Sequence, residues 1–314
     1  MILVTGGTGF IGQALVRHLV EAGHQVRLLV RPSAASPRLP RGVPLDVVIS
    51  SLEDERGLRA AMMGVDVIYH LAGAERHGIR ANLVEVDIQG TQAIMRAAAD
   101  ARVERVFFLS HLGADRASAY PVFKAKAVAE EHVRRSGVDY TIVRSAIAFG
   151  ANDRFTTGLA QLLHTLPFVF LLPGDGSTLI QPIWVEDLAT CLTWALDETE
   201  TRNQVIEIGG PEYFTFQQAV QTVMNVLAVR RRLIPTRLPY LRALTLALES
   251  LLPALPISVY WLDYLAVNRT CALDSVPRTF HLMPSRFSQR LAYLRKVNWR
   301  GVFWRMALRR KSLS

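Results

Sequence analysis

The sequence predicts an α/β fold in which a doubly wound parallel sheet is followed by a smaller, mainly helical C-terminal region. Two observations predict this fold. The chain opens with an apolar run, residues 1–4, and a glycine-rich loop that leads into a helical pattern. Short apolar runs then alternate with helical patterns up to about residue 144. Such alternation is typical of a parallel sheet that is covered by helices on both faces.

The glycine-rich loop has the spacing Gly6-x-x-Gly9-x-x-Gly12 between a strand and a helix. Gly6 permits a tight turn, Gly9 lets the backbone approach a pyrophosphate, and Gly12 lets the helix lie close to the sheet. The start of the helix adds free N–H groups and a positive dipole end. We therefore predict a Rossmann-type dinucleotide site whose pyrophosphate contacts are Gly6, Thr8, Gly9, Phe10, Ile11 and Gly12.

Periodicity places the remaining elements in order. Strands are expected at 25–30, 45–49, 66–71, 105–110, 140–144 and 205–208. Helices are expected at 53–63, 82–99, 117–136, 186–196 and 216–227, with a further helix and an apolar continuation over 151–173. We divide the chain into a cofactor-binding domain, 1–150, and a substrate or partner region, 151–314, that is interleaved with the same sheet.

The residue that ends the second strand indicates which dinucleotide fits. An acidic residue there accepts hydrogen bonds from the free ribose hydroxyls, whereas an arginine pairs with a 2′-phosphate. Arg31 stands at this position, with Arg38 and Arg41 in the following loop. NADP(H) is therefore predicted in preference to NAD(H), and an ordinary solvated surface arginine is the alternative.

Two further loops are expected to border the cofactor. After the fourth strand, Leu71, Ala72 and Gly73 let the backbone pass under the adenine and ribose, while His70 is expected to pack within the sheet. After the third strand, Ser51 and Leu52 border the adenine.

The charge of the chain is unevenly distributed. The net charge is +9, yet residues 275–314 alone contain ten Lys or Arg and no acid, so the rest of the chain carries −1. The only two cysteines, Cys191 and Cys271, form no metal or redox motif, and no metal site is expected. A strand that begins at Met1 leaves no room for a signal peptide, so a cytoplasmic location is expected.

The C-terminal part suggests contact with a membrane or a partner. Residues 241–265 are strongly apolar, and Tyr260, Trp261 and Tyr264 suit an interfacial surface, although packing on the body is the alternative. In the tail, Trp299, Phe303 and Met306 are spaced i, i+4, i+7 among basic residues. This pattern predicts a basic amphipathic helix for a lipid or protein surface and not for nucleic acid.

Several motifs in order, together with the glycine loop, give the chain a family resemblance. They are His70-Leu71-Ala72-Gly73, Asp87-Ile88-Gln89-Gly90-Thr91, Tyr120-x-x-x-Lys124 and Pro182-Ile183-Trp184-Val185-Glu186-Asp187. Over residues 1–215 the chain resembles the extended and atypical short-chain dehydrogenase/reductases. Residues 110–150 look most like the NADPH-binding accessory subunit of mitochondrial complex I and its bacterial relatives. Residues 136–144 also resemble photosystem assembly factors.

The resemblance implies candidate catalytic residues. In active members a tyrosine is the acid/base and a lysine one helical turn later lowers its pKa, and Tyr120 and Lys124 match this pattern. Such spacing puts both side chains on one helix face. A hydroxyl usually stands where this chain has Leu112, and Ser110 or Ser118 can replace it only if the loop brings one near Tyr120.

Three further positions depart from the family pattern: Asp87 replaces an Asn, Ser145 replaces a Pro, and Ser50-Ser51 replaces an acid. We therefore expect an accessory or assembly component of a membrane redox complex, peripheral to the inner face of the membrane, with a structural cofactor. It would contact the complex or an anionic membrane through 230–314. The alternative is an NADP-dependent oxidoreductase, epimerase or dehydratase of a small or isoprenoid-like substrate, using Tyr120 and Lys124.

Overall fold

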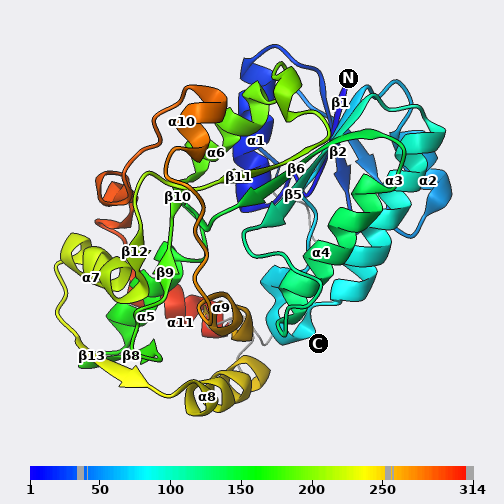
Figure 1. The fold of residues 1–314 in the computed structure, drawn as a ribbon. Helices are drawn as coiled ribbons and strands as arrows, with labels where there is room; N and C mark the ends of the chain where they lie inside the picture. Colours follow the sequence, from blue (N-terminus) through cyan, green and yellow to red (C-terminus); the bar gives the residue numbers. More distant parts are fainter. Residues whose placement is uncertain (34–38, 41, 252–255, 257, 309–314) are drawn as a thin grey trace.

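Seven parallel strands form the central sheet, in the order β11-β6-β5-β4-β1-β2-β3 (Figure 1). The computed structural model describes residues 1–33, 39–40, 42–251, 256 and 258–308. The strands of the sheet are β1 (Ile2–Thr5), β2 (Val26–Val30), β3 (Asp46–Ile49), β4 (Val67–His70), β5 (Arg105–His111), β6 (Asp139–Ser145) and β11 (Gln204–Ile208). The predicted fold class is confirmed, and each predicted strand lies within one residue of its observed limits.

Helices cover both faces of the sheet (Figure 1). On one face lie α1 (Phe10–Glu21) and α6 (Val185–Trp194), and on the other lie α2 (Glu55–Ala61), α3 (Gly90–Asp100) and α4 (Pro121–Arg134). The predicted helix over 82–99 is interrupted, because a π-helical turn, Val84–Gln89, precedes α3. Each face buries its own apolar cluster, so the sheet has the two hydrophobic sides that its apolar strands predict.

The C-terminal region builds a third apolar cluster beyond the carboxyl edge of the sheet. The helix and apolar continuation predicted over 151–173 are observed as a helix, α5 (Thr156–Thr165), and a strand, β8 (Val169–Pro173), which pairs in parallel with β13 (Arg232–Thr236). The other elements of this region are β7 (Ala148–Phe149), β9 (Leu179–Ile180), β10 (Ile183–Trp184), β12 (Phe214–Thr215), α7 (Phe216–Leu227), α8 (Leu238–Leu251), α9 (Val259–Tyr264), α10 (Ser275–Phe280) and α11 (Trp299–Leu308).

The predicted tail helix is present as α11, but its apolar side is not available to a membrane. Trp299 and Phe303 are 7% and 8% exposed, and α11 packs against α5. The indole Nε1 of Trp299 donates a hydrogen bond to the carbonyl oxygen of Leu294 at 2.8 Å. The prediction that this stripe faces a lipid surface is therefore wrong, because the stripe covers the core of the protein itself. Arg309, Arg310 and Lys311 lie outside the described residues.

None of the helices in the described part of the chain combines the length and the apolar character that crossing a bilayer requires.

Replacing Trp299 with alanine should destabilise the protein by about 3 kcal/mol, because it removes a buried aromatic ring and its hydrogen bond. Trp304, which is 50% exposed on the same helix, is the matched control, and Trp304→Ala should change stability by less than about 0.5 kcal/mol. Urea denaturation of both variants gives the two values. Equal losses would mean that α11 does not pack on the body in solution.

Candidate functional site

The loop between β1 and α1 has the shape of a pyrophosphate cradle. Gly6 has a φ of +71°, and a Cβ atom there would lie 2.6 Å from the carbonyl carbon of Leu71. A Cβ atom on Gly12 would lie 2.3 Å from the carbonyl oxygen of Gly6, so only glycine lets α1 come this close. A Cβ atom on Gly9, by contrast, would contact only the carbonyl oxygen of Gly6, at 3.1 Å. No side chain caps the start of the helix at this residue. The first turn of α1 therefore offers its N–H groups to an anion.

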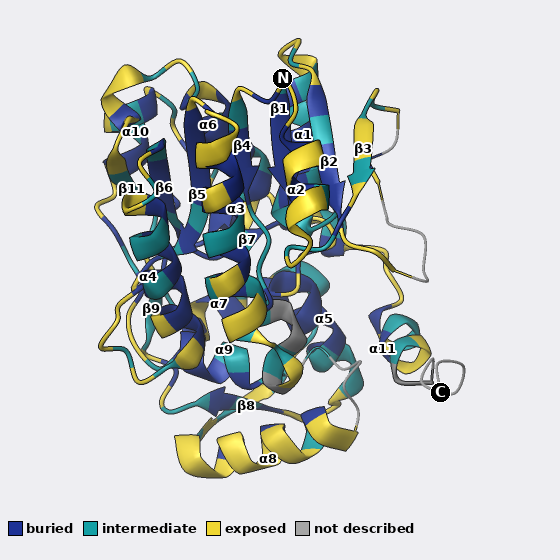
Figure 2. Ribbon diagram, turned by 90° about the vertical axis from the view of Figure 1, so that its right-hand side faces the viewer, coloured by how far each residue is buried: buried dark blue, intermediate teal, exposed yellow. Residues whose placement is uncertain are grey.

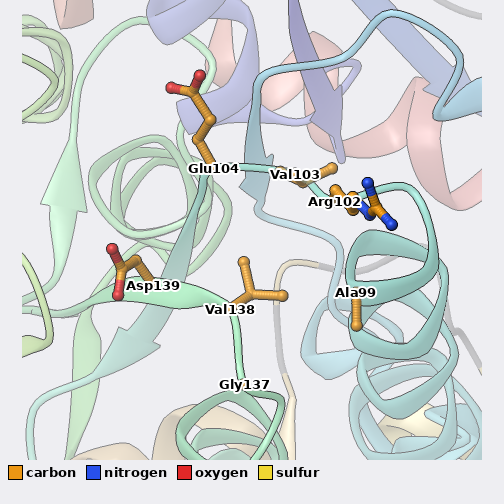
Figure 3. Close-up of a pocket in the computed structure, with 7 residues that line it drawn as sticks. All are labelled: Ala99, Arg102, Val103, Glu104, Gly137, Val138 and Asp139. Atoms are coloured by element: carbon orange, nitrogen blue, oxygen red, sulfur yellow. The ribbon is translucent and has the colours of Figure 1, made fainter.

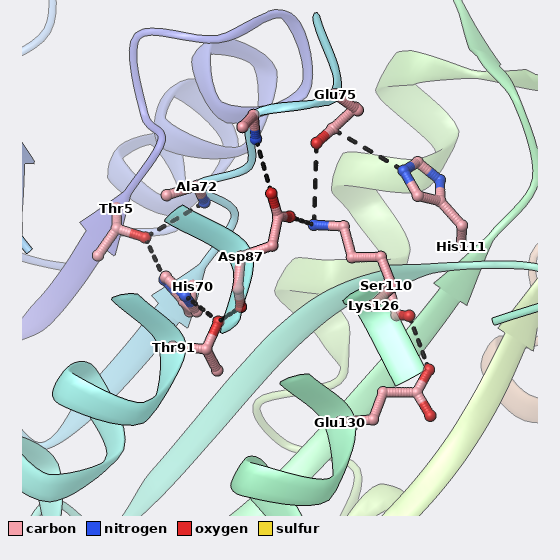
Figure 4. A network of polar contacts seen from close by, with 11 residues as sticks. Thr5, His70, Ala72, Glu75, Asp87, Thr91, Ser110, His111, Lys126 and Glu130 are labelled. Atoms are coloured by element: carbon pink, nitrogen blue, oxygen red, sulfur yellow. Dashed lines mark hydrogen bonds and ion pairs between the residues drawn. The ribbon is translucent and has the colours of Figure 1, made fainter. Parts of the chain in front are cut away.

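A chain of hydrogen bonds fixes the backbone that borders this cradle (Figure 4). The N–H of Ala72 donates to Thr5 Oγ1 at 3.3 Å, and Thr5 Oγ1 lies 2.6 Å from Nδ1 of His70. His70 Nε2 lies 3.0 Å from Oγ1 of Thr91, which donates to the carbonyl of Asp87 at 2.6 Å. Thr91 is thus an acceptor for His70, which makes Nε2 the protonated nitrogen. Burial, together with the charge of Lys126, lowers the pKa of His70 to about 3, so this ring is neutral and has a structural role.

The other predicted cofactor residues lie at the same edge of the sheet, because they follow the carboxyl ends of parallel strands. Arg31 is exposed directly after β2, while Ser51 and Leu52 are half-buried after β3. Leu71, Ala72 and Gly73 are half-buried after β4, as are Thr8, Phe10 and Ile11 around the start of α1. Arg38 and Arg41 lie outside the described residues.

The predicted catalytic pair, Tyr120 and Lys124, does not share a helix face. The predicted helix over 117–136 begins only at Pro121, and Tyr120 is its extended N-cap residue, with φ −98° and ψ 120°. Proline favours the first helical position and holds the residue before it in an extended conformation. Tyr120 is therefore half-buried beside the C-terminal cluster, and Lys124 is exposed in the first turn of the helix. The prediction of a shared face is wrong, and Pro121 is the signal that corrects it.

The lysine that α4 directs into the site is Lys126, which the sequence analysis missed. Its side chain is 3% exposed, and its Nζ lies 2.8 Å from Asp87 Oδ1 and 4.0 Å from Glu75 Oε2 (Figure 4). A Cβ atom on Gly73 would lie 3.0 Å from this Nζ, so the ammonium ion borders the predicted cofactor loop. Burial opposes its charge, but Asp87 and Glu75 raise the pKa of Lys126 above the ordinary value.

Two described side chains near the start of α4 and the end of β5, Val122 and Leu112, carry no hydroxyl. Val122, one helical turn before Lys126, is buried, and Leu112 is 2% exposed beneath the loop after β5. Ser110 is 1% exposed and donates to Glu130 Oε1 at 2.7 Å. Because Glu130 also binds Arg144 and Arg134, Ser110 belongs to an internal ionic network. The remaining candidate, Ser118, accepts a hydrogen bond from the backbone N–H of Tyr120 at 3.2 Å.

One further polar pair faces Lys126. His111 Nε2 lies 3.8 Å from Glu75 Oε1, too far for a hydrogen bond, and this nitrogen has no hydrogen-bond partner in the described residues. Burial alone would raise the pKa of Glu75, but Lys126 and His111 hold it well below the ordinary value. The ring of Tyr260 lies 6.2 Å from the imidazole. Glu75, His111 and Lys126 therefore form a polar cluster at the carboxyl edge of the sheet.

The C-terminal region closes over this group. Arg269, 3% exposed, lies 3.3 Å from the ring centroid of Phe123, and it donates to the carbonyl oxygens of Leu112 and Tyr264 at 3.2 and 3.0 Å. Tyr264 itself is 1% exposed, and Tyr260 and Trp261 are packed against the same cluster. The prediction that these three aromatic residues form an outer surface is wrong, because α9 turns them towards the site.

A separate, open depression of about 400 Å³ lies at the opposite edge of the sheet, at the amino ends of β5 and β6 (Figure 3). It is lined by Ala99, Arg102, Val103, Glu104, Gly137, Val138 and Asp139. In parallel α/β sheets ligands bind outside the carboxyl ends of the strands. This depression is therefore not the dinucleotide site.

Comparison with known proteins agrees with this geometry. A family model described as NAD(P)H-binding matches residues 6–162. The chain is 28% identical over 250 residues to NADH dehydrogenase (ubiquinone) 1 alpha subcomplex subunit 9, mitochondrial, of Arabidopsis thaliana, which covers 77% of this chain and 61% of that protein. It is 30% identical over 244 residues to the ceramide reductase of Caulobacter vibrioides, with 76% and 74% covered.

A solved structure has the same fold. It is a short-chain dehydrogenase/reductase superfamily protein from Agrobacterium tumefaciens with bound NAD, which is 19% identical, has a TM-score of 0.66 and covers 93% of this chain and 94% of its own. The chain spans less than two thirds of the length of the Arabidopsis subunit. The glycine cradle, the sheet order and the matched family model lead to one conclusion: the chain belongs to the NAD(P)H-binding family, within the atypical short-chain dehydrogenase/reductase superfamily.

Proposed function

We propose that this protein is an accessory or assembly component of a membrane redox complex and that it holds NADP(H) as a structural cofactor. The observation that carries this proposal is the buried ion pair between Lys126 and Asp87 at 2.8 Å, with Val122 one helical turn before the lysine. The glycine loop has the shape that a pyrophosphate needs, whereas Ser110 is held by Glu130 and Val122 carries no hydroxyl. We therefore infer that the chain binds the dinucleotide but lacks a well-placed proton donor for reduction of a substrate.

Proton transfer explains why this arrangement is a poor catalyst. A phenol has a pKa of about 10 and becomes an effective acid/base near neutral pH only if a cation beside it lowers that value. Tyr120 is the extended residue before α4 and not part of the helix that carries Lys126, and Val122 has no proton to give. The charge of Lys126 is already balanced by Asp87 and Glu75. Ser110 is held by Glu130 and does not replace the missing hydroxyl.

Two findings support the choice of cofactor and partner. Arg31 is exposed at the end of β2, and no described carboxylate pairs with it, so its guanidinium group is free to bind a 2′-phosphate. The similarity to a mitochondrial NADH dehydrogenase subunit over 77% of this chain supports a place in a redox complex.

A second candidate function is NADP-dependent reduction, and the pair His111–Glu75 is the observation that favours it. The imidazole Nε2 has no hydrogen-bond partner in the described residues and lies near Lys126 and the Gly73 loop. The similarity to a ceramide reductase supports a lipid-like carbonyl substrate. In this alternative His111, and not Tyr120, supplies the proton.

The buried ion pair generates a prediction about stability and pH. Lys126→Met leaves Asp87 and Glu75 buried without their cation, and it should cost about 3–5 kcal/mol at pH 7. The pKa of Glu75 is lowered in the folded protein, so the wild type loses its contribution to stability as the pH falls below the unfolded carboxyl value, about 4.3. Without the lysine, burial favours the protonated form of Glu75, so acid stabilises the variant relative to the wild type.

The measured difference in unfolding free energy between wild type and Lys126→Met should therefore shrink from pH 7 to pH 4.5. Lys124→Met, on the exposed side of the same helix, is the matched control and should stay within about 0.5 kcal/mol at both pH values. A difference that is the same at both pH values would contradict the assigned ion pair.

The cofactor preference gives a third prediction. NADPH should bind more tightly than NADH, and Arg31→Ala should remove most of the preference, because a charge-assisted hydrogen bond contributes about 1.5–3 kcal/mol, or roughly ten- to a hundredfold. Arg59→Ala, an equal loss of an exposed arginine on α2, should leave the preference unchanged. Calorimetric titration of the wild type and both variants with NADPH and NADH at moderate salt gives the six dissociation constants that test this prediction. Equal affinities of the wild type for both dinucleotides would rule the assignment out.

A fourth prediction concerns turnover. Bound NADPH should be oxidised negligibly by aldehydes, ketones, nucleotide sugars and keto-lipids, as followed by absorbance in single-turnover mixtures. Rapid oxidation by any of them would overturn the accessory role. The variants Tyr120→Phe and His111→Asn would then tell which side chain supplies the proton.

A further inference from the structure

Helix α8 differs from an ordinary surface helix, because polar residues lie on its buried side and most of its exposed side is apolar. The side that faces the protein carries Leu241, Thr245 and Glu249, which are 9%, 3% and 5% exposed. Glu249 accepts a hydrogen bond from the backbone N–H of Val259 at 3.0 Å. On the same side of the helix, Arg242 pairs with Asp263. Thr245, Glu249 and the ion pair of Arg242 thus make polar contacts with the body of the protein.

The opposite side of α8 is apolar and exposed. Tyr240 and Leu251 are 69% and 66% exposed, and Leu244 and Leu246 are 46% and 39% exposed. The exposed residues between them, Ala243 and Ala247, are also uncharged. Figure 2 shows α8 exposed along most of its length at one end of the molecule. A surface helix normally buries its apolar stripe, so this orientation leaves an apolar face without a partner.

The exposed apolar surface continues onto the neighbouring ribbon. Leu166 and Phe168 are 40% and 79% exposed just before β8, and Val169 is 36% exposed within it. Helix α8 contacts β8 directly, and Figure 1 places α8, β8 and β13 at the same end of the molecule. We call the exposed side chains of Leu166, Phe168, Tyr240, Leu244, Leu246 and Leu251 the α8 face.

Unpaired positive charge borders the α8 face. Residues 229–248 contain five arginines and no acidic residue. Arg230, Arg232 and Arg237 are exposed, and no described carboxylate pairs with them. Arg231 is different, because it donates to backbone carbonyls of Leu163 and Leu166 and so holds this end of the ribbon in place. The unpaired charges that residues 229–248 place beside the α8 face are therefore all positive.

We propose that the α8 face lies on an anionic lipid bilayer. An uncharged helical surface with aromatic residues and a border of arginines matches the headgroup boundary, where apolar side chains are buried and guanidinium groups meet lipid phosphates. Besides the Tyr240 hydroxyl, the exposed polar side chains of α8 are Arg242, which pairs with Asp263, and Ser250, whose hydroxyl donates to the carbonyl of Leu246, so few polar groups are left for a protein partner. The inference rests on the membrane part of the proposed function and assigns its contact to α8 and not to the tail.

The test is sedimentation of the full chain with vesicles, using phosphatidylcholine alone and phosphatidylcholine mixed with phosphatidylglycerol. The double variant Leu244→Glu and Leu251→Glu changes exposed positions only. The double variant Met63→Glu and Ile49→Glu is the matched control. Met63 follows the C-cap of α2 and is 70% exposed, and Ile49 ends β3 and is 68% exposed. Both residues lie at the other end of the molecule from α8. Retained NADPH affinity shows that each variant is folded.

We expect the wild type and the control to bind the anionic vesicles and the α8 variant to lose at least about tenfold in affinity, since each apolar side chain that is removed gives up burial in the interface. Arg230→Gln, Arg232→Gln and Arg237→Gln together should weaken binding to anionic vesicles and not to neutral ones. Failure of the wild type to bind anionic vesicles, or equal binding by the α8 variant, would overturn the proposal and leave a protein as the occupant of the α8 face. The assay contains no substrate, so its failure is distinct from failure of the structural-cofactor proposal, which NADPH turnover tests.

Discussion

A buried ammonium ion is stable only beside a negative charge. The site of this protein is organised around the carboxylates that balance Lys126. At 3% exposure the lysine is stable only because Asp87 lies 2.8 Å away and Glu75 lies 4.0 Å away. Asp87 also accepts the N–H of Ala74 at 3.0 Å, and its own carbonyl accepts the hydroxyl of Thr91. The same residue therefore neutralises the lysine and anchors the relay that shapes the cofactor loop.

This ion pair and the α8 face lie in different parts of the fold. The glycine loop and Lys126 are at the carboxyl edge of the sheet, and α8 is at the far end of the C-terminal region (Figure 1). Segment 258–269 connects the two, because Asp263 pairs with Arg242 on α8 while Arg269 and Tyr260 cover the site. The site and the α8 face are therefore joined by continuous packing through one segment of the chain.

The sequence predicts the sheet and the glycine loop well, because both depend on local patterns. Each strand is a short apolar run between turns, and the role of Gly6 follows from its backbone conformation alone. The same reasoning does not locate Lys126. Which lysine of α4 points inward depends on where the helix begins, and this start is shifted from 117 to Pro121. A shift of four residues leaves a helix pattern recognisable, yet it removes Tyr120 from the helix face.

The C-terminal region shows the second limit of sequence reasoning. An amphipathic pattern indicates which side of a helix is apolar but not what covers that side. The tail helix and α8 are both rich in apolar residues. The structure buries the stripe of α11 against α5 and leaves that of α8 exposed. Only tertiary packing distinguishes the two helices. It places the apolar surface that we propose to meet a membrane on α8, around Tyr240, and not on α11, around Trp299.

The most direct test of this account is an experimental structure of the protein with NADPH bound, in which the distance between Lys126 Nζ and Asp87 is measured. The account predicts that the two remain within ion-pair distance, with Val122 beside the lysine and no side-chain hydroxyl replacing it. Movement of Lys126 away from Asp87 onto the nicotinamide ribose, with the hydroxyl of Tyr120 brought next to it, would contradict the account.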